Sequence, residues 1–323
     1  MMRICVLLAS LLSGCLPATL PAQTGPSGYH LVHQYSLGGE GGWDYLTLDG
    51  ATRRLFVARS TRVMVVDADS GKLLSEIPDT PGVHGVALVP ALNRGFISNG
   101  REGTVSVFDL KTLKVSQKIK VGENPDAILY DPFSKRVFAF NGRSHDASVI
   151  DAETEKVVGT IPLSGKPEFG VSDGQGRVYV NVEDKGELAL LDPKEMKVKA
   201  TWSLAPCEEP TGLALDRANH RLFSGCSNKL MAVVDAESGK LLTTLPIGDG
   251  VDGVAFDPEV SLAFSSNGEG TVTVVKEESP QKFSVLETVP TVAGARTITL
   301  DPKLHQLFTV TKSETFVLLM LAK

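Results

Sequence analysis

Polar side chains that could bind a ligand recur along the chain, in most repeats about twelve positions before a repeated aromatic residue. They comprise four carboxylates, an imidazole, a hydroxyl and a guanidinium: Asp44, His84, Asp126, Glu168, Thr211, Asp252 and Arg296. If the fold gathers these positions, they line one opening. Such a set of groups can bind a metal ion, an organic cation or another polar molecule.

Four carboxylates around a narrow opening repel one another by about 1–4 kcal/mol for each close pair. Water and salt, the Arg296 guanidinium, a bound cation, or protonation of carboxyls with raised pKa values would relieve this repulsion. For a divalent metal we expect His84, Asp126 and Glu168 as ligands, because mixed oxygen and nitrogen donors suit a Zn- or Mn-like ion better than calcium. Three interpretations stay open: a wet mouth without a ligand, binding of an organic molecule or protein segment, and binding of a metal. No other cofactor is expected.

Further residues should flank the same opening. Trp43 and Glu209 lie close to ring positions in the sequence, and Arg59, Asn99 and Asn141 end the second strands of their repeats. These residues are candidates for ligand contact. Glycine follows each of the two asparagines, which also predicts turns with positive φ.

The repeated aromatic residues define a period of about 40–45 residues, which is typical of propeller blades. They are Phe56, Phe96, Phe138, Tyr179, Phe223, Phe264 and Phe308. Around each one we expect four short strands, with an Asp-Pro turn often following the first and an aspartate ending the third. The predicted fold class is all-β: a seven-bladed β-propeller with four antiparallel strands per blade.

The last repeat ends after its third strand, which we expect over residues 315–321. Residues 29–37, followed by two glycines, resemble the fourth strands of the other repeats. We therefore expect the N-terminal strand to complete the last blade and cover its open edge.

Residues 1–22 resemble a signal peptide, because Arg3 precedes an apolar run too short to span a bilayer. Alternatively, residues 12–15 form a lipobox in which Cys15 is lipidated. Residues 23–28 should be a linker and residues 29–323 a single propeller. The sequence thus predicts an exported protein of the periplasm or cell envelope, either soluble or lipid-anchored. The remaining cysteines, Cys207 and Cys226, predict a disulfide in such a compartment.

The net charge of −6 and the absence of any Lys/Arg-rich run do not favour nucleic-acid binding. The sequence contains no phosphate-binding loop, nucleophile elbow or His-Glu-x-x-His motif. Residues 248–253 match a dinucleotide-binding pattern but lead into a strand rather than a helix, so that match is a false positive. We expect a monomer that contacts a membrane only through the alternative lipid anchor.

Six segments carry a resemblance to a known family. They are Gly41-Gly42-Trp43-Asp44-Tyr45-Leu46, Pro81-Gly82-Val83-His84-Gly85-Val86, Asn124-Pro125-Asp126-Ala127-Ile128, Pro206-Cys207-Glu208-Glu209-Pro210-Thr211-Gly212, Gly248-Asp249-Gly250-Val251-Asp252-Gly253 and Gly294-Ala295-Arg296-Thr297. The chain is similar to the YVTN-repeat, YncE-like family of exported seven-bladed propellers over residues 29 to about 310. The resemblance implies fold and export, but no single chemistry. We expect binding of a small molecule or protein segment at the channel mouth, without turnover. The alternatives are a metal-dependent hydrolytic enzyme of lactonase or lyase type at the same mouth, and an envelope assembly scaffold.

Overall fold

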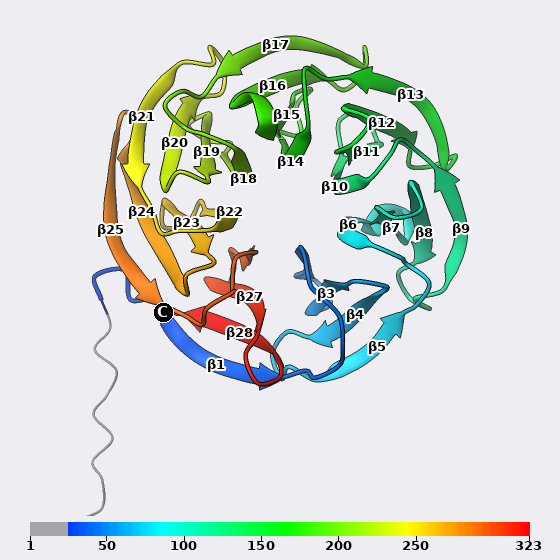
Figure 1. The fold of residues 1–323 in the computed structure, drawn as a ribbon, viewed down its shortest axis with the longest axis horizontal. Helices are drawn as coiled ribbons and strands as arrows, with labels where there is room; N and C mark the ends of the chain where they lie inside the picture. The colour runs from blue at the N-terminus through cyan, green and yellow to red at the C-terminus, as the bar shows by residue number, and fades with distance from the viewer. Residues whose placement is uncertain (1–24) are drawn as a thin grey trace, which may run out of the picture.

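The computed structural model describes residues 25–323. Within them, seven four-stranded antiparallel sheets are arranged as blades around a common axis (Figure 1). In six blades the strands follow chain order across the sheet, whereas the seventh combines the last three strands with the first strand of the chain. The predicted fold class is confirmed.

Blades 1 to 3 contain β2–β5 (Leu46–Asp49, Arg54–Arg59, Arg62–Asp67, Leu73–Ile77), β6–β9 (Val83–Val89, Arg94–Asn99, Thr104–Asp109, Val115–Lys120) and β10–β13 (Pro125–Asp131, Arg136–Asn141, Asp146–Asp151, Lys156–Pro162). Blades 4 to 6 contain β14–β17 (Pro167–Ser172, Val178–Val182, Glu187–Asp192, Lys197–Ser203), β18–β21 (Pro210–Asp216, Arg221–Cys226, Leu230–Asp235, Leu241–Pro246) and β22–β25 (Val251–Asp257, Leu262–Asn267, Thr271–Ser279, Lys282–Pro290). Blade 7 contains β26–β28 (Thr299–Asp301, Gln306–Lys312, Phe316–Ala322) and β1 (His30–Ser36). Between strands of the described chain lie two short 3₁₀ helices, η1 (Pro90–Leu92) and η2 (Glu183–Lys185).

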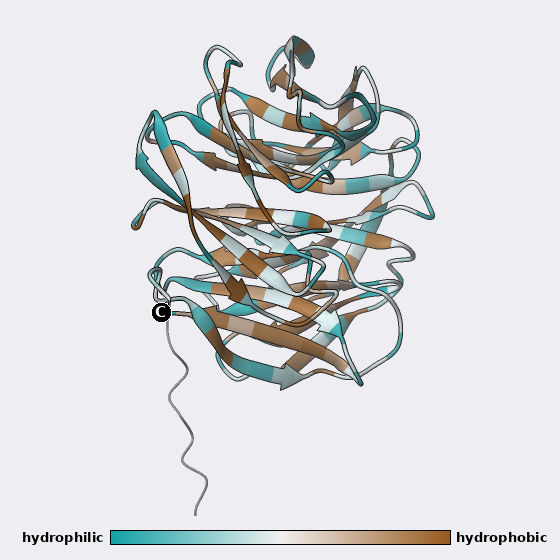
Figure 2. Cartoon of the chain, turned by 60° about the vertical axis from the view of Figure 1, so that its left-hand side comes forward, coloured by the Kyte–Doolittle hydropathy of each residue, from teal (hydrophilic) through white to brown (hydrophobic). Residues whose placement is uncertain are grey.

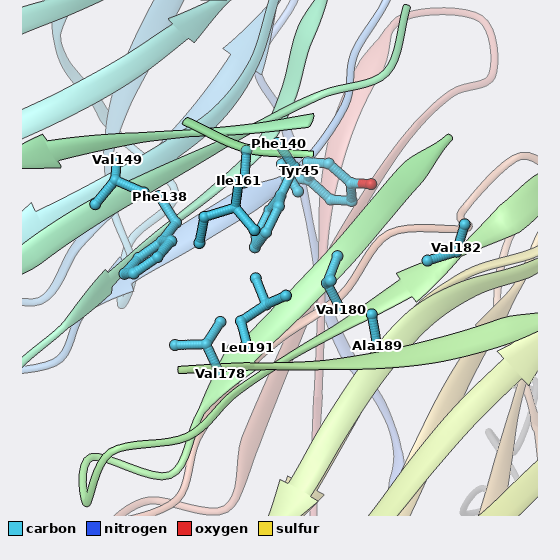
Figure 3. Packing of buried hydrophobic residues seen from close by; sticks show 12 residues of the cluster. Tyr45, Phe138, Phe140, Val149, Ile161, Val178, Val180, Val182, Ala189 and Leu191 are labelled. Carbon is cyan, nitrogen blue, oxygen red and sulfur yellow. The ribbon is translucent and has the colours of Figure 1, made fainter. Parts of the chain in front are cut away.

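The repeated aromatic residues lie on the second strands and are fully buried. Each interface between neighbouring blades holds a hydrophobic layer; between blades 3 and 4, Phe138 and Ile161 pack against Val178 and Leu191 (Figure 3). Burying a side chain of this kind contributes about 1.5–3 kcal/mol to the stability of the fold. The fourth strands, such as β5 and β9, are largely exposed, and many turns are hydrophilic (Figure 2). The aromatic residue therefore recurs once per repeat because each blade buries one in the layers between blades.

The ring is closed by pairing between the two ends of the folded chain. Strand β1 pairs antiparallel with β28, from His30 opposite Ala322 to Ser36 opposite Val317. β1 lies at the rim of the ring, beside β28 (Figure 1). The predicted closure of the last blade by the N-terminal strand is confirmed.

The segment before β1 differs in part from its prediction. Residues Gly25 to Gly28 form a turn, in which the Gly28 amide donates to the Gly25 carbonyl at 3.0 Å. The Ser27 amide donates to Oε1 of Glu287 on β25 at 3.2 Å, so the last part of the predicted linker packs against blade 6. The predicted signal peptide and Cys15 lie outside the described residues. Within residues 25–323, no helix is long and apolar enough to cross a membrane.

Cys207 and Cys226 form the predicted disulfide, with Cα atoms 5.7 Å apart. Both residues are buried in the hydrophobic layer between blades 4 and 5. The bond joins the segment before β18 to the end of β19, so it links both strands at one edge of blade 5.

We expect a chain that begins at Leu37 to lose cooperative folding, whereas a chain that begins at Gly25 keeps it. Without β1, the backbone groups along one edge of β28 lose their partners, and the exposed edge favours aggregation. Thermal unfolding followed by circular dichroism, combined with size-exclusion chromatography, checks this. A sharp transition at an undiminished Tm for the shorter chain would contradict the closure argument.

Candidate functional site

The ring positions lie where the innermost strands begin, one from each blade. Asp44 and Arg296 precede β2 and β26, whereas the other members lie in the first residues of their strands: His84 in β6, Asp126 in β10, Glu168 in β14, Thr211 in β18 and Asp252 in β22. In an antiparallel blade these strand starts share one edge, and the ring brings the seven edges to one face. The channel mouth is defined here by these seven residues together with Tyr45 and Lys166, whose side chains contact Glu168.

Asp44, His84 and Asp126 form the most tightly connected part of the mouth. His84 Nδ1 lies 2.6 Å from Asp44 Oδ2 and 3.4 Å from Asp126 Oδ1. Burial alone would lower the pKa of His84, but the hydrogen bond with Asp44 and the charge of Asp126 raise it to about 9. Burial raises the pKa of Asp126 to about 6, with His84 opposing the shift. At neutral pH the imidazole is therefore a cation between two carboxylates.

A second group surrounds the phenol of Tyr45. This side chain starts in blade 1 and reaches blade 4, where its hydroxyl donates to Glu168 Oε1 at 3.0 Å and its ring packs against Phe169. Burial and the four surrounding carboxylates, Glu168 first, raise the pKa of Tyr45 well above its usual value. Tyr45 thus crosses the centre of the ring as a neutral hydrogen-bond donor.

Glu168 itself is held between a phenol and an ammonium. Its Oε2 lies 3.2 Å from Lys166 Nζ but accepts no well-aligned hydrogen bond from residues 25–323. Burial, followed by the Asp126 charge, raises the pKa of Glu168 to about 8 although Lys166 opposes the shift. Lys166 also pairs with Glu183, and the two carboxylates raise its pKa despite its own burial.

On the other side of the mouth, Arg296 Nε donates to Asp252 Oδ2 at 2.7 Å. Burial and the Asp44 charge keep the pKa of Asp252 raised even with this partner. The Arg296 guanidinium lies 5.8 Å from the ring centre of Trp43, whose indole Nε1 is buried without a partner among residues 25–323. Thr211 donates its hydroxyl to the Val251 carbonyl at 3.0 Å, so it joins blades 5 and 6.

The geometry changes the predicted metal ligands. Ligand atoms of Asp44, His84 and Asp126 lie within 4.8 Å of one another; among the described residues this is the group that could hold a metal. Glu168 is not a member, because it binds Tyr45 and faces Lys166, whose ammonium repels a metal cation. The structure thus groups Asp44 with two of the expected ligands, His84 and Asp126, and leaves Glu168 outside this group; metal binding stays a prediction.

Arg59, a predicted ligand contact, is buried and supports the fold. Its side chain is fully buried, and its Nη1 and Nη2 donate to the carbonyls of residues 39–42, with the Gly41 carbonyl nearest at 2.6 Å. The guanidinium also stacks on Phe316 of β28, 3.6 Å from the ring centre. Positive φ at Gly39 and Gly41 lets the carbonyls converge on it. These contacts leave the guanidinium no exposed surface for a ligand.

Asn99 and Asn141 also face inward. Asn99 Nδ2 donates to Ser106 at 2.8 Å, and Asn141 Nδ2 donates to Ser148 at 2.9 Å, so each side chain joins the second strand to the third. Neither asparagine has a positive φ, nor does the glycine that follows it. The glycines lie in turns as predicted, but without the positive φ, and each asparagine makes a buried hydrogen bond between strands. Glu209 is exposed near the mouth, and its role in ligand contact stays a prediction.

Two residues of the mouth escaped the sequence analysis. Tyr45 directly follows the ring position Asp44, and Lys166 precedes Glu168 by two residues. The only signal for either was this proximity. Alignment of the repeats could not show that Tyr45 crosses to blade 4, because that contact joins residues 123 positions apart.

No protein-family model and no curated protein matches the sequence. Among solved structures, the chain is similar to a chain of Kuenenia stuttgartiensis hydrazine synthase, with a TM-score of 0.77 and 17% identity over 88% of this chain and 98% of that chain. It is also similar to a chain of a mitotic checkpoint complex, with a TM-score of 0.77 and 14% identity over 99% of this chain and 98% of that chain. At such identities these similarities show the β-propeller fold alone.

We expect the Tm to fall as the pH rises from 6 to 9. Glu168, Asp126 and His84 all have raised pKa values in the folded protein, about 8, 6 and 9. Each group contributes most to the stability of the fold below the pKa that it has in the unfolded chain. This contribution is lost as the pH rises through the pKa that the group has in the folded protein. In Glu168→Gln the decline should be shallower, with a Tm above that of the wild type at pH 9.

Thermal unfolding at several pH values, together with NMR titration of the His84 ring, tests this expectation. Glu314→Gln is the matched control, because Glu314 is exposed in the turn between β27 and β28. If the Glu168→Gln and wild-type curves run parallel, Glu168 does not titrate in this range.

Proposed function

We propose that this protein is an exported, YncE-like propeller that binds a cationic organic group at its channel mouth, without turnover. The group is an ammonium or guanidinium, carried by a small molecule or by a segment of a protein partner. The proposal rests on one observation. Five carboxyl groups meet three cationic side chains at and beside the mouth: Asp44, Asp126, Glu168, Glu183 and Asp252 against His84, Lys166 and Arg296.

This imbalance favours a cationic ligand because the excess carboxyl groups are buried. Asp126 and Glu168 are only 8% and 7% exposed, so water screens their charges poorly. Glu168, whose pKa is raised to about 8, avoids full ionisation at neutral pH by holding a proton, whereas Asp126, with a pKa of about 6, is largely ionised there. A bound ammonium or guanidinium would stabilise the ionised forms and supply a donor to Glu168 Oε2.

Trp43 adds an aromatic surface to the same mouth. Arg296 already lies near the face of this indole, and the cation of a ligand can occupy a similar place. Hydrogen-bond acceptors beside an aromatic ring are a common arrangement for recognising organic cations. The charged and aromatic groups therefore support the same ligand class.

Export is supported by two observations. The first residues of the sequence resemble a signal peptide or lipobox, and the disulfide in blade 5 suits an oxidising compartment. The resemblance to YncE-like propellers points to the same location, the periplasm or cell envelope. A protein partner fits the fold as well, since one structurally similar chain belongs to a mitotic checkpoint complex.

A second candidate is a divalent-metal site, favoured by the grouping of Asp44, His84 and Asp126. There, a metal-bound water could act as the nucleophile of a hydrolytic enzyme. The metal would have to displace the proton that His84 holds at its hydrogen bond with Asp44. The cost of removing that proton ranks this candidate second.

For the cationic ligand, isothermal titration calorimetry should detect binding of agmatine at pH 7. Agmatine is a small molecule that carries one guanidinium and one ammonium group. In Asp126→Asn the affinity should fall at least about tenfold, equivalent to about 1.4 kcal/mol, because one buried carboxylate is lost. Asp249→Asn is the control, since Asp249 is exposed and pairs with Lys229. Absence of binding by agmatine and other organic cations, or equal losses in both variants, would contradict the proposal.

For the metal, equilibrium dialysis against Zn²⁺ and Mn²⁺ should find one tightly bound ion per chain if the second candidate holds. The bound ion should disappear in His84→Ala and remain in His305→Ala, whose imidazole pairs with Asp257 elsewhere in the structure. Chelation should then lower the Tm of the wild type. Metal uptake that is equal in both variants would exclude the mouth as its site.

A further inference from the structure

A basic pocket lies beside the acidic mouth, on the same face of the ring. Its volume is about 240 Å³, and it is formed between blades 2 and 3. Its walls come from the turn between β7 and β8, the end of β9, the segment before β10 and the turn between β11 and β12: Gly100, Arg101, Glu102, Gly103, Lys120, Glu123, Asn124 and Arg143.

The pocket shares a wall with the mouth. A Cβ atom added to Gly100 would lie 2.6 Å from His84 Nε2 and 2.8 Å from Asn124 Oδ1, so backbone alone separates the pocket from His84. On the other side, a Cβ on Gly142 would lie 3.3 Å from Asn124 Nδ2 and 3.6 Å from Lys166 Cε. Asn124, which lines the pocket, therefore stands between two charged residues of the mouth.

The cations of this pocket are not neutralised. Arg101 and Arg143 are exposed, and neither guanidinium has an ion-pair partner among residues 25–323. Lys120 Nζ donates to a backbone carbonyl, that of Glu102, at 2.9 Å. Of the two acidic residues in the walls, Glu102 is already paired with Lys118, which leaves Glu123 as the remaining carboxylate.

The acidic mouth and the basic pocket therefore lie on either side of the backbone at Gly100. The mouth has more carboxyl groups than cations, and the pocket has more cations than free carboxylates. Arg101 and Arg143 both line this pocket, and guanidiniums are well suited to a carboxylate because each offers paired donors in a planar fork.

We propose that the ligand is dipolar: a small molecule whose cationic group enters the mouth near Asp126 and whose carboxylate binds Arg101 and Arg143. This inference rests on the proposed function, since it assigns the cationic end to the same mouth. The chemical class is that of basic amino acids, in which one compact molecule carries both charges. Binding both ends at once raises affinity, because the second contact is intramolecular.

The test compares pairs of compounds that differ by one carboxylate. Agmatine is arginine without its carboxylate, and cadaverine is lysine without it. By calorimetry at low salt, L-arginine or L-lysine should bind the wild type at least tenfold more tightly than its partner compound. The double variant Arg101→Gln/Arg143→Gln should lower the affinity for the amino acid to that for the decarboxylated compound. Lys303→Gln/Lys312→Gln, which also removes two exposed charges, should leave the difference intact.

The outcomes separate the two proposals. If agmatine or cadaverine binds as tightly as its amino acid, the dipolar assignment is overturned while the cationic mouth stands. If none of the four compounds binds, both proposals fail. The wild-type comparison needs no variant, so misfolding of the double variant cannot obscure the result.

Discussion

Every feature of this molecule depends on the contact that closes the ring. Strand β1 pairs with β28, and Arg59 fastens the connection between β1 and β2. Its guanidinium donates hydrogen bonds to the carbonyls of residues 39–42 and stacks on Phe316 of the last strand. One buried side chain therefore contacts the first blade, the last blade and the segment between them. Burial lowers the pKa of Arg59 only to about 10, so it stays charged near neutral pH and keeps these hydrogen bonds.

Closure also explains how the mouth can hold so many like charges. An open ring would let the carboxylates separate and hydrate, whereas the closed ring holds them around Tyr45. The protein balances the resulting repulsion locally, with His84 between Asp44 and Asp126, Lys166 beside Glu168, and Arg296 on Asp252. The balance is incomplete, and the raised pKa values of Asp126 and Glu168 result from this excess of carboxyl groups together with their burial. Packing energy from seven hydrophobic layers maintains this electrostatically unfavourable arrangement.

The neighbouring blades 2 and 3 show how a propeller creates different environments on one face. The mouth uses the starts of the inner strands, which point to the axis. The basic pocket uses the turns between second and third strands, which lie farther along each blade. Gly100 lets these two environments approach, because any side chain there would meet His84.

The sequence by itself determined the number of blades, their strand order and the closing strand. These features follow from local patterns: an aromatic once per repeat, β-branched third strands, and a last repeat that lacks a strand. It also suggested that Asp44, His84 and Asp126 share one opening with four other ring positions, because equal offsets within repeats become equivalent places in a ring. Only the tertiary structure decided which groups pair. Asp44, rather than Glu168, has a ligand atom close to those of His84 and Asp126. Arg59 is bound to the carbonyls before β2, and Tyr45 reaches Glu168 from blade 1. Repeat alignment gives a residue's blade and level, but the direction and reach of its side chain depend on contacts between residues far apart in the chain.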